Sequence, residues 1–287
     1  MEIKINKLTK IYDKKVAVDH VSVTLRPGIT GLLGANGSGK TTLMRMMVDV
    51  LKPNQGEILW NGSNIHSCME EYLSELGYLP QHAGMYPSFR VDEFLEYIGA
   101  LKGLKSAYTK KRIDELLQDL NLKDVKRKKI KTLSGGMRQR LGIVQCLLND
   151  PSIIILDEPT VGLDPKERNQ FAMLLSSIAK DKVILISTHI VSDIENIANQ
   201  VLIMKNGSFV DHASPEELLS AIRGKVYEKL CTMQELQELA KTCIICNQKN
   251  EGSSMKLRLI SESPLDAAII EPTLNDVYLY HFQEEAL

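Results

Sequence analysis

The chain has 287 residues, 44% of them hydrophobic and 25% charged, which is the composition of a globular protein with one large or two smaller domains. The formal net charge of −1 gives no general argument for nucleic acid or an anionic membrane as a partner. No apolar stretch approaches the roughly 18 residues of a membrane-spanning helix, and the N-terminus lacks the apolar core of a signal peptide. We therefore expect a cytoplasmic protein, for which another chain supplies any membrane span.

The first part of the chain predicts strands that lead to a loop and a helix. Apolar and polar residues alternate on both sides of a turn at residues 13–15. A short apolar strand then enters a glycine-rich loop, and residues 40–51 have a helical pattern. The strands predicted here are residues 2–12, 17–25, 29–34, 56–62 and 76–81.

The middle of the chain predicts helices inside a mixed fold. Residues 91–104 and 110–122 carry apolar side chains at helical spacing, which indicates a helical subdomain at about residues 85–150. Strands and helices then alternate again, as in a largely parallel α/β core. The later segments are strands at 153–158, 183–187 and 201–207 and helices near 165–179 and 191–198.

The C-terminal part predicts a separate small domain. Ser214 and Glu217 form a capping box at a helix start. A strand, a helix, two strands and a helix follow, which indicates an α+β appendage. We place the boundary between residues 1–213 and residues 214–287.

Five cysteines are scattered along the chain at positions 68, 146, 231, 243 and 246. An odd, scattered set without a secretion signal predicts reduced thiols. Cys243 and Cys246 have the CxxC spacing, but no second ligand pair follows at zinc-site spacing. Their short apolar run, TCIIC, favours packing in a buried strand over redox or metal chemistry.

Residues 34–41, GANGSGKT, match the pattern GxxxxGK[ST] between a strand and a helix. The glycines let backbone amides turn inward around an anion, and the helix N-terminus adds its dipole. Lys40 would reach the β and γ phosphates of a nucleotide, and the Thr41 hydroxyl would coordinate Mg²⁺. A chance glycine-rich turn is the alternative, which the flanking strand and helix disfavour. The predicted phosphate-binding residues are Gly34, Asn36, Gly37, Ser38, Gly39, Lys40, Thr41 and Thr42.

The apolar strand at 153–158, IIILDE, ends in two acids. A magnesium nucleotide needs a carboxylate near the metal, and Asp157 fits that need. Glu158 could orient or deprotonate the attacking water. Two acids after an apolar run are by themselves more typical of a solvated strand end, and the phosphate loop reverses this preference.

Residues 133–140, LSGGMRQR, predict a second anion site at a helix start, in a chain that already has one. With this segment, residues 2–213 closely resemble the nucleotide-binding subunit of an ATP-binding cassette (ABC) transporter. The resemblance rests on the ordered set of phosphate loop, YLPQ, LSGGMRQR, ILDEP, VGLDP and STH. It implies an α/β fold: a P-loop NTPase core with a mostly parallel sheet, an antiparallel β subdomain and a helical signature subdomain, here followed by the small α+β appendage.

The resemblance implies roles for single residues around the nucleotide. Tyr12 lies where the family has an aromatic residue that stacks on adenine, although by sequence alone it is a strand-end tyrosine. Gln81 matches the glutamine that senses Mg²⁺ and the attacking water and links the core to the helical arm. His189 matches the histidine that contacts the γ phosphate and positions the catalytic Glu158. His82 has no family role, and we expect it at the surface.

The resemblance also explains the second anion site. In the family signature, Ser134 and the amides of Gly135 and Gly136 bind the γ phosphate of ATP held by the other subunit. Asp164 matches the loop that joins the two active sites across a dimer. Met137 stands where the most frequent form has glutamine, and we expect no loss of activity from it.

The function implied by the resemblance is that of an ATPase subunit with ATP and Mg²⁺ as its ligands. It would form a homodimer, or a heterodimer with another ABC subunit, around two ATP. It would drive a separate transmembrane permease from the inner face of the cell membrane. The tail PTLNDVYLY, residues 272–280, resembles tails on cassette subunits of bacterial exporters and favours export of a drug, peptide or lipid.

The alternative is a soluble ABC ATPase that acts on nucleic acid or ribosomes. The chain has a single cassette and no visible coiled-coil or zinc insertion, which argues against this class. The basic run at 123–131, KDVKRKKIK, is consistent with a nucleic-acid or lipid-headgroup site. We expect it instead to be a solvated segment before the signature helix, and we expect no nucleic acid as partner.

Overall fold

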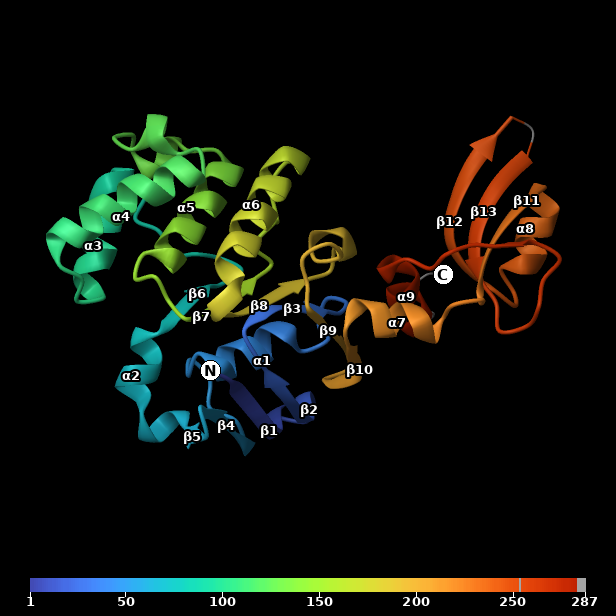
Figure 1. Ribbon diagram of the computed structural model, residues 1–287, viewed down its shortest axis with the longest axis horizontal. Helices are drawn as coiled ribbons and strands as arrows, with labels where there is room; N and C mark the ends of the chain where they lie inside the picture. The colour runs from blue at the N-terminus through green and yellow to red at the C-terminus, as the bar shows by residue number, and fades with distance from the viewer. Residues whose placement is uncertain (253, 283–287) are drawn as a thin grey trace. The chain divides into compact units, whose positions relative to one another are not determined.

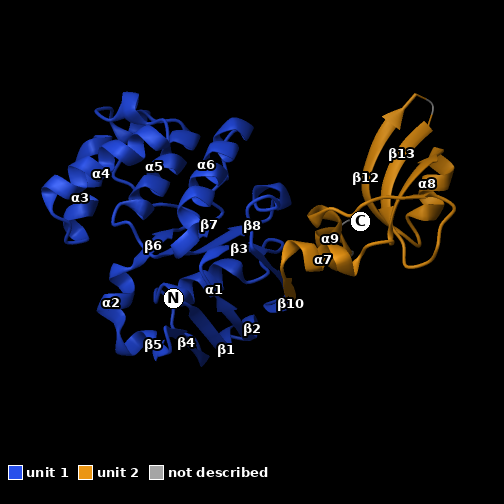
Figure 2. Ribbon diagram, in the orientation of Figure 1, with its two compact units in different colours: residues 1–209 blue, residues 210–287 orange. Residues whose placement is uncertain are grey.

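The computed structural model describes residues 1–252 and 254–282 (Figure 1). The chain divides into two units, residues 1–209 and residues 210–287 (Figure 2). The first unit contains an antiparallel sheet, a parallel sheet and a group of helices. The expected α/β class with its antiparallel and helical subdomains is confirmed.

The antiparallel sheet of the first unit has the strand order β2-β1-β4-β5. The turn expected at residues 13–15 joins β1 to β2, where Tyr12 pairs with Lys15. Alternation along β1 buries Ile3 and Ile5 on one face, as the period-two pattern predicts. The strands are β1 (Ile3–Tyr12), β2 (Lys15–Leu25), β4 (Gln55–Trp60) and β5 (Ser63–Asn64).

The second sheet has the order β10-β9-β3-β8-β7-β6, and its pairings β9-β3, β3-β8, β8-β7 and β7-β6 are parallel. Strands β7 and β8 are buried on both faces, which explains their continuous apolar sequences. The carboxyl ends of these parallel strands meet at one edge of the sheet, where ligands bind in such folds. The strands are β3 (Gly28–Leu33), β6 (Leu76–Leu79), β7 (Ile153–Asp157), β8 (Val183–Thr188), β9 (Gln200–Lys205) and β10 (Ser208–Ala213).

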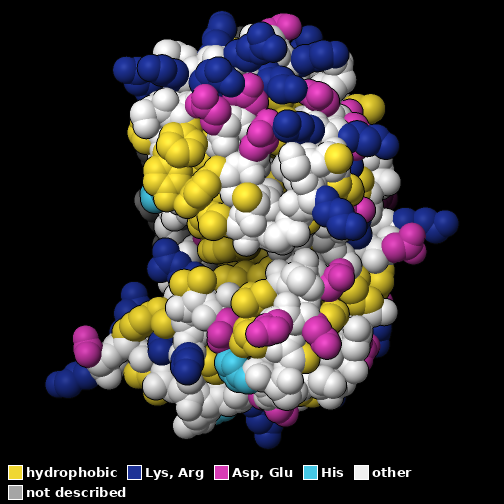
Figure 3. Space-filling model, turned by 90° about the vertical axis from the view of Figure 1, so that its left-hand side faces the viewer, with side chains coloured by type: hydrophobic (Ala, Val, Ile, Leu, Met, Phe, Trp, Pro, Cys, Tyr) yellow, Lys and Arg dark blue, Asp and Glu magenta, His cyan; other side chains and the backbone are white. Residues whose placement is uncertain are grey.

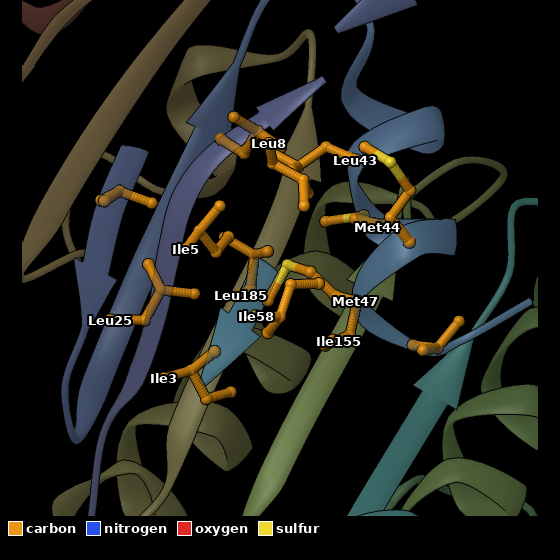
Figure 4. Packing of buried hydrophobic residues seen from close by; sticks show 14 of the residues in the cluster. Ile3, Ile5, Leu8, Leu25, Leu43, Met44, Met47, Ile58, Ile155 and Leu185 are labelled. Carbon is orange, nitrogen blue, oxygen red and sulfur yellow. The ribbon is translucent and has the colours of Figure 1, made fainter. Parts of the chain in front are cut away.

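Helix α1 (Lys40–Met47) packs between the two sheets of the first unit. Figure 4 shows Leu43 and Met47 of α1 among side chains from both sheets, including Ile58 of β4 and Ile155 of β7. The helix ends four residues before the predicted end at residue 51. This core holds α1 in place, so that its N-terminus lies at the edge of the sheet where β3 and β7 end.

The helical subdomain predicted at about residues 85–150 is present and lies on one side of the parallel sheet (Figure 1). Its helices pack on one another, and the last of them also contacts β6. Another helix, α6 (Pro165–Ile178), follows β7. The helices of the subdomain are α3 (Val91–Leu101), α4 (Ser106–Asp119) and α5 (Gly135–Leu147), and a short helix α2 (Met69–Ser74), which the sequence did not reveal, precedes β6.

The prediction of a helix near residues 191–198 is wrong. Only a one-turn 3-10 helix forms, at Val191–Asp193. Val191 and Ile194 are buried and imitate helical spacing. The segment turns toward β9 instead, where the amide of Asn199 donates to the carbonyl of Ile29 at 2.7 Å.

The second unit has its own four-stranded antiparallel sheet, with the order β12-β13-β11-β14. The capping box predicted at Ser214 and Glu217 is present at the start of α7. Cys243 and Cys246 are free and half-buried at the edge strand β12, not in a fully buried strand. The elements are α7 (Pro215–Ala221), β11 (Val226–Cys231), α8 (Met233–Leu239), β12 (Ile244–Glu251), β13 (Ser254–Ile260), β14 (Ala268–Ile269) and α9 (Leu274–His281).

Within residues 1–252 and 254–282, no helix combines the length and the apolar character that a bilayer span requires.

Candidate active site

The glycine-rich loop leaves β3 and enters α1 through backbone that only glycine adopts without strain. Gly39 precedes the helix with a φ of 111°, and a Cβ there would lie 2.4 Å from the carbonyl oxygen of Ala17. A Cβ on Gly34 would lie 2.4 Å from the carbonyl oxygen of Met204. The backbone of Ala17 and Met204 thus fills the space behind these two glycines, and the loop leads into a helix N-terminus, which is the setting of an anion cradle.

Lys40 is the buried cation of this loop. Its ammonium donates to the carbonyls of Gly34 at 2.6 Å and Ala35 at 3.1 Å, and it lies 3.9 Å from Oε1 of Glu158. Burial lowers the pKa of Lys40, against the opposite effect of the Glu158 and Asp157 carboxylates. A phosphate group at this helix N-terminus would stabilise the desolvated ammonium of Lys40.

The structure brings most of the predicted nucleotide residues to one cavity of about 450 Å³. Tyr12 reaches it from the end of β1, and Gln81 reaches it from the loop after β6. Glu158 lines it from the end of β7. The remaining lining residues are Lys15, Ala17, Asn36, Gly37, Gly39, Lys40, Thr41 and Thr42.

Asp157 lies fully buried at the end of β7. Its Oδ1 accepts a hydrogen bond of 2.6 Å from the hydroxyl of Ser187. Its Oδ2 is buried and has no hydrogen-bond partner among the residues that the structure describes, and the same holds for the hydroxyl oxygen of Ser38. A buried, unpaired carboxylate oxygen beside a phosphate loop fits a divalent cation, so the residues present are suitable for Mg²⁺.

Glu158 has a backbone conformation that is unusual for a side chain of its kind. Its φ is 52°, in the left-handed region, which costs about 1–3 kcal/mol and is typical of functional sites. Its amide donates to the hydroxyl of Ser187 at 3.0 Å. Its Oε2 lies 2.8 Å from Nδ1 of His189, at the end of β8. Two of the three predicted catalytic residues, Glu158 and His189, therefore form a hydrogen-bonded pair, and the third is Gln81.

The signature residues and Asp164 do not line this cavity in their own chain. Ser134 is exposed and caps α5, where it accepts from the amide of Met137 at 3.2 Å. Asp164 caps α6 and accepts from the amide of Glu167 at 2.8 Å. Gly135 and Gly136 follow Ser134 in the first turn of α5. Each of these segments is a helix start that the side chain of its own first residue caps.

Sequence reasoning missed Asp193, whose side chain is 3% exposed. Its carboxylate accepts from the hydroxyls of Thr160 at 2.5 Å and Thr188 at 3.3 Å, and it pairs with Arg168 at 3.3 Å. Thr160 follows Glu158 closely, and Thr188 precedes His189. One carboxylate thus fixes both loops that carry the catalytic pair. Its sequence signal was weak, because an acid in a supposed helix is ordinary.

The basic run at residues 123–131 is mostly exposed. Lys126 pairs with Asp114 of α4 at 2.5 Å. The run begins in a single 3-10 turn at Lys123–Val125, before the signature helix.

A family model described as "ABC transporter" matches residues 18–161, which are 144 of the 287 residues. The chain belongs to the ABC transporter family. An uncharacterized ABC transporter ATP-binding protein of Bacillus subtilis is 32% identical over 285 residues, which cover 96% of this chain and 90% of that protein. This cassette chain is therefore an ATPase, the ATP-binding subunit of an ABC transporter.

Two further ABC proteins illustrate the similarity. A protein of Burkholderia pseudomallei called "Nod factor export ATP-binding protein I" is 30% identical over 291 residues, which cover 96% of this chain and 95% of that protein. A solved "ATP binding subunit of ABC transporter" superposes with a TM-score of 0.70 at 26% identity, over 77% of this chain and 93% of that chain.

Proposed function

We propose that two ABC cassettes close around two ATP molecules, with each site built from the phosphate loop of one chain and the signature of the other. The observation that carries this proposal is the position of Ser134, Gly135 and Gly136. They form an exposed helix start suited to an anion, yet they lie outside the ATP cavity of their own chain. ATP then favours the closed dimer because it contacts both halves.

Within each site, this chain's residues bind and orient the substrate. The loop amides and Lys40 hold the phosphates, and Tyr12 stacks on the adenine. Thr41, Gln81 and Asp157 would hold Mg²⁺, which neutralises charge on the phosphates during transfer to water. The unpaired Oδ2 of Asp157 supports this assignment.

Glu158 acts as the general base that takes a proton from the attacking water. His189 holds the Glu158 carboxylate through the 2.8 Å contact and contacts the γ phosphate. Ser187 fixes the Glu158 amide and Oδ1 of Asp157 together, so that both acids keep their relative positions. Gln81 lines the same cavity and orients the water.

The movement of dimer closure is transmitted through the helical subdomain to a separate transmembrane permease. Because it binds that permease, this subunit lies on the inner face of the cell membrane. The face that includes this subdomain carries a hydrophobic patch beside a rim of Lys and Arg (Figure 3). Within residues 85–150, Tyr86, Phe89 and Tyr97 form an aromatic cluster with ring centroids 5.2–5.9 Å apart, and Tyr86 is 50% exposed. Exposed aromatic clusters are typical of protein interfaces.

Residues 1–213 are the ATPase domain in this proposal, and residues 214–287 are an appendage on it. The direction of transport is export. The name of the Burkholderia relative, which describes an export protein, and the tail at residues 272–280 support this direction. A drug, a peptide or a lipid is the proposed class of cargo. ATP-dependent accumulation of such a cargo in inside-out vesicles that contain this subunit and its permease tests the direction. Accumulation only in right-side-out vesicles would mean import.

The substitution Ser134→Arg tests the composite site. The long arginine side chain fills the space that the γ phosphate of the partner's ATP would take, so hydrolysis and ATP-dependent dimers are lost. The affinity of the isolated chain for ATP stays within about twofold of the wild-type value. Equilibrium binding of a fluorescent ATP analogue and phosphate release measure the two properties. Loss of ATP binding by the isolated chain would show that the signature acts within its own chain.

A further inference from the structure

Three residues on one face of the signature helix contact the loop of their own chain that follows Glu158. Gly136, Gln139 and Arg140 stand at helical spacing i, i+3 and i+4, so they share this face of α5. The contacted segment comprises the loop that begins at Glu158 and the first turn of α6, which contains Glu167. The same helix therefore presents Ser134 to the solvent at its start and touches the catalytic loop along its side.

Gln139 contacts the backbone of the catalytic acid, Glu158. Its side-chain amide donates to the carbonyl of Pro159 at 3.0 Å and to the carbonyl of Glu158 at 3.4 Å. On the other side of the same residue, Ser187 holds the amide of Glu158 at 3.0 Å. A left-handed backbone such as that of Glu158 persists only where its surroundings hold it in place. Gln139 and Ser187 are the side chains that hold this backbone, beside backbone hydrogen bonds to the carbonyl of Ser187 and from the amide of Val161.

The flanking contacts make the junction rigid. A Cβ on Gly136 would lie 3.0 Å from the carbonyl oxygen of Gly162, so helix and loop approach as closely as glycine allows. Arg140 pairs with Glu167 at 2.7 Å, and both side chains are largely buried. Glu167 in turn accepts the amide of Asp164 at 3.2 Å. A displacement of α5 therefore moves the loop that carries Glu158.

We infer that Gln139 is a positioning residue that couples the two ATP sites of the dimer. It transmits engagement of the signature helix by the partner's ATP to the backbone of Glu158 in its own chain. This inference rests on the proposed function, in which the start of α5 binds that ATP. Hydrolysis in one site then depends on the nucleotide of the other, because one helix touches both.

The substitution Gln139→Met tests this role, because it keeps the side-chain length and the helix propensity and removes the donor. We expect kcat at saturating ATP to fall roughly tenfold, the size typical of one lost positioning contact, while KM for ATP changes less than about twofold. Gln139→Glu has the same shape, lacks the donor and places a carboxylate against the two carbonyl oxygens, so its kcat falls at least as far. Gln145→Met, on the same helix, is the matched control and keeps the wild-type kcat.

A double-variant cycle with Ser134→Ala separates this inference from the proposed function. If Gln139 relays engagement of the signature, the kcat of the double variant is no lower than that of the worse single variant. Full kcat in both Gln139 variants, an equal loss in Gln145→Met, or multiplied losses in the double variant would each overturn the inference. An unchanged kcat in Ser134→Ala, with reduced kcat in Gln139→Met, would instead contradict the composite site of the proposed function.

Discussion

Two glycines of the phosphate loop are required for different reasons, although both have positive φ. Gly39 has a φ of 111° and faces the backbone of Ala17, so a side chain meets both strain and a clash. Gly37 has a φ of 83°, and no atom lies within 4 Å of a Cβ placed there. Strain alone therefore opposes a side chain at Gly37.

The pair Gly39→Ala and Gly37→Ala measures this difference without nucleotide. We expect Gly39→Ala to lower the free energy of unfolding by about 3 kcal/mol or more, because the start of α1 must move away from Ala17. Gly37→Ala lowers it by about 1 kcal/mol. Urea unfolding followed by the fluorescence of Trp60 gives both values. Equal losses would contradict the close packing behind Gly39.

Asp193 supports the two loops that carry Glu158 and His189, and its removal should therefore slow hydrolysis. Asp193→Ala leaves Thr160 and Arg168 without their shared carboxylate, so the loops of Glu158 and His189 lose their common support. We expect single-turnover hydrolysis to fall roughly tenfold with ATP binding retained. Ser192→Ala, an exposed neighbour in the same turn, is the control. Wild-type hydrolysis by Asp193→Ala would refute this supporting role.

At the scale of elements, the C-terminal helix α9 is fixed by a buried ion pair. Asp276 is fully buried, closes the capping box with Thr273, and receives Arg258 at 2.9 Å and 2.5 Å. Arg258 also donates to the carbonyl of Glu271 at 2.7 Å. Within the motif at 272–280, Thr273 and Asp276 therefore have a structural role: both cap α9, and Asp276 binds Arg258 inside the second unit.

Asp276→Ala is expected to destabilise the second unit by about 3 kcal/mol, because it leaves Arg258 without its partner. Asp266→Ala, an exposed acid of the same unit, changes its stability by less than about 0.5 kcal/mol. Hydrogen exchange of the amides of β13 and α9 measures the effect. Unchanged exchange in Asp276→Ala would contradict the anchoring role.

The pH dependence of the second unit follows from the same pair. Burial opposes ionisation of Asp276, but the hydrogen bonds from Arg258 and Thr273 outweigh it and lower its pKa. A lowered pKa contributes stability that is complete above the unfolded value of about 3.9 and is lost as pH falls through the folded value. The protection factors of the α9 amides, which correct for the slower intrinsic exchange in acid, should thus fall below about pH 4 in the wild type. Asp276→Asn should lack this part of the pH dependence.

Elements with local signals could be predicted from the sequence, and contacts between distant segments could not. The apolar runs of β7 and β8 and the capping box at Ser214 are local patterns. The contact of Gln139 with Glu158 forms only when the helical subdomain folds back on the sheet. Residues 191–198 misled prediction for the same reason, because Asn199 bonds to a distant strand instead of continuing a helix.

At the scale of the whole molecule, every residue assigned to ATP lies within residues 1–209, the first unit. The second unit has a core of its own, built around Tyr227, Leu257 and Leu259. Removal of residues 214–287 is therefore expected to leave ATP affinity within about twofold of the full chain. Isothermal titration with ATP checks this. A soluble fragment that no longer binds ATP would show that the appendage belongs to the nucleotide site.

The central claim is that ATP joins two of these chains and that Glu158 ends the joined state by hydrolysis. Glu158→Gln keeps the shape of the side chain and removes the base, so the ATP-bound dimer accumulates. With ATP and Mg²⁺, light scattering should give a mass of about 64 kDa, twice the 32.2 kDa of the chain, and phosphate release should nearly vanish. A variant that stays monomeric with ATP bound, or that releases phosphate at the wild-type rate, would contradict this claim.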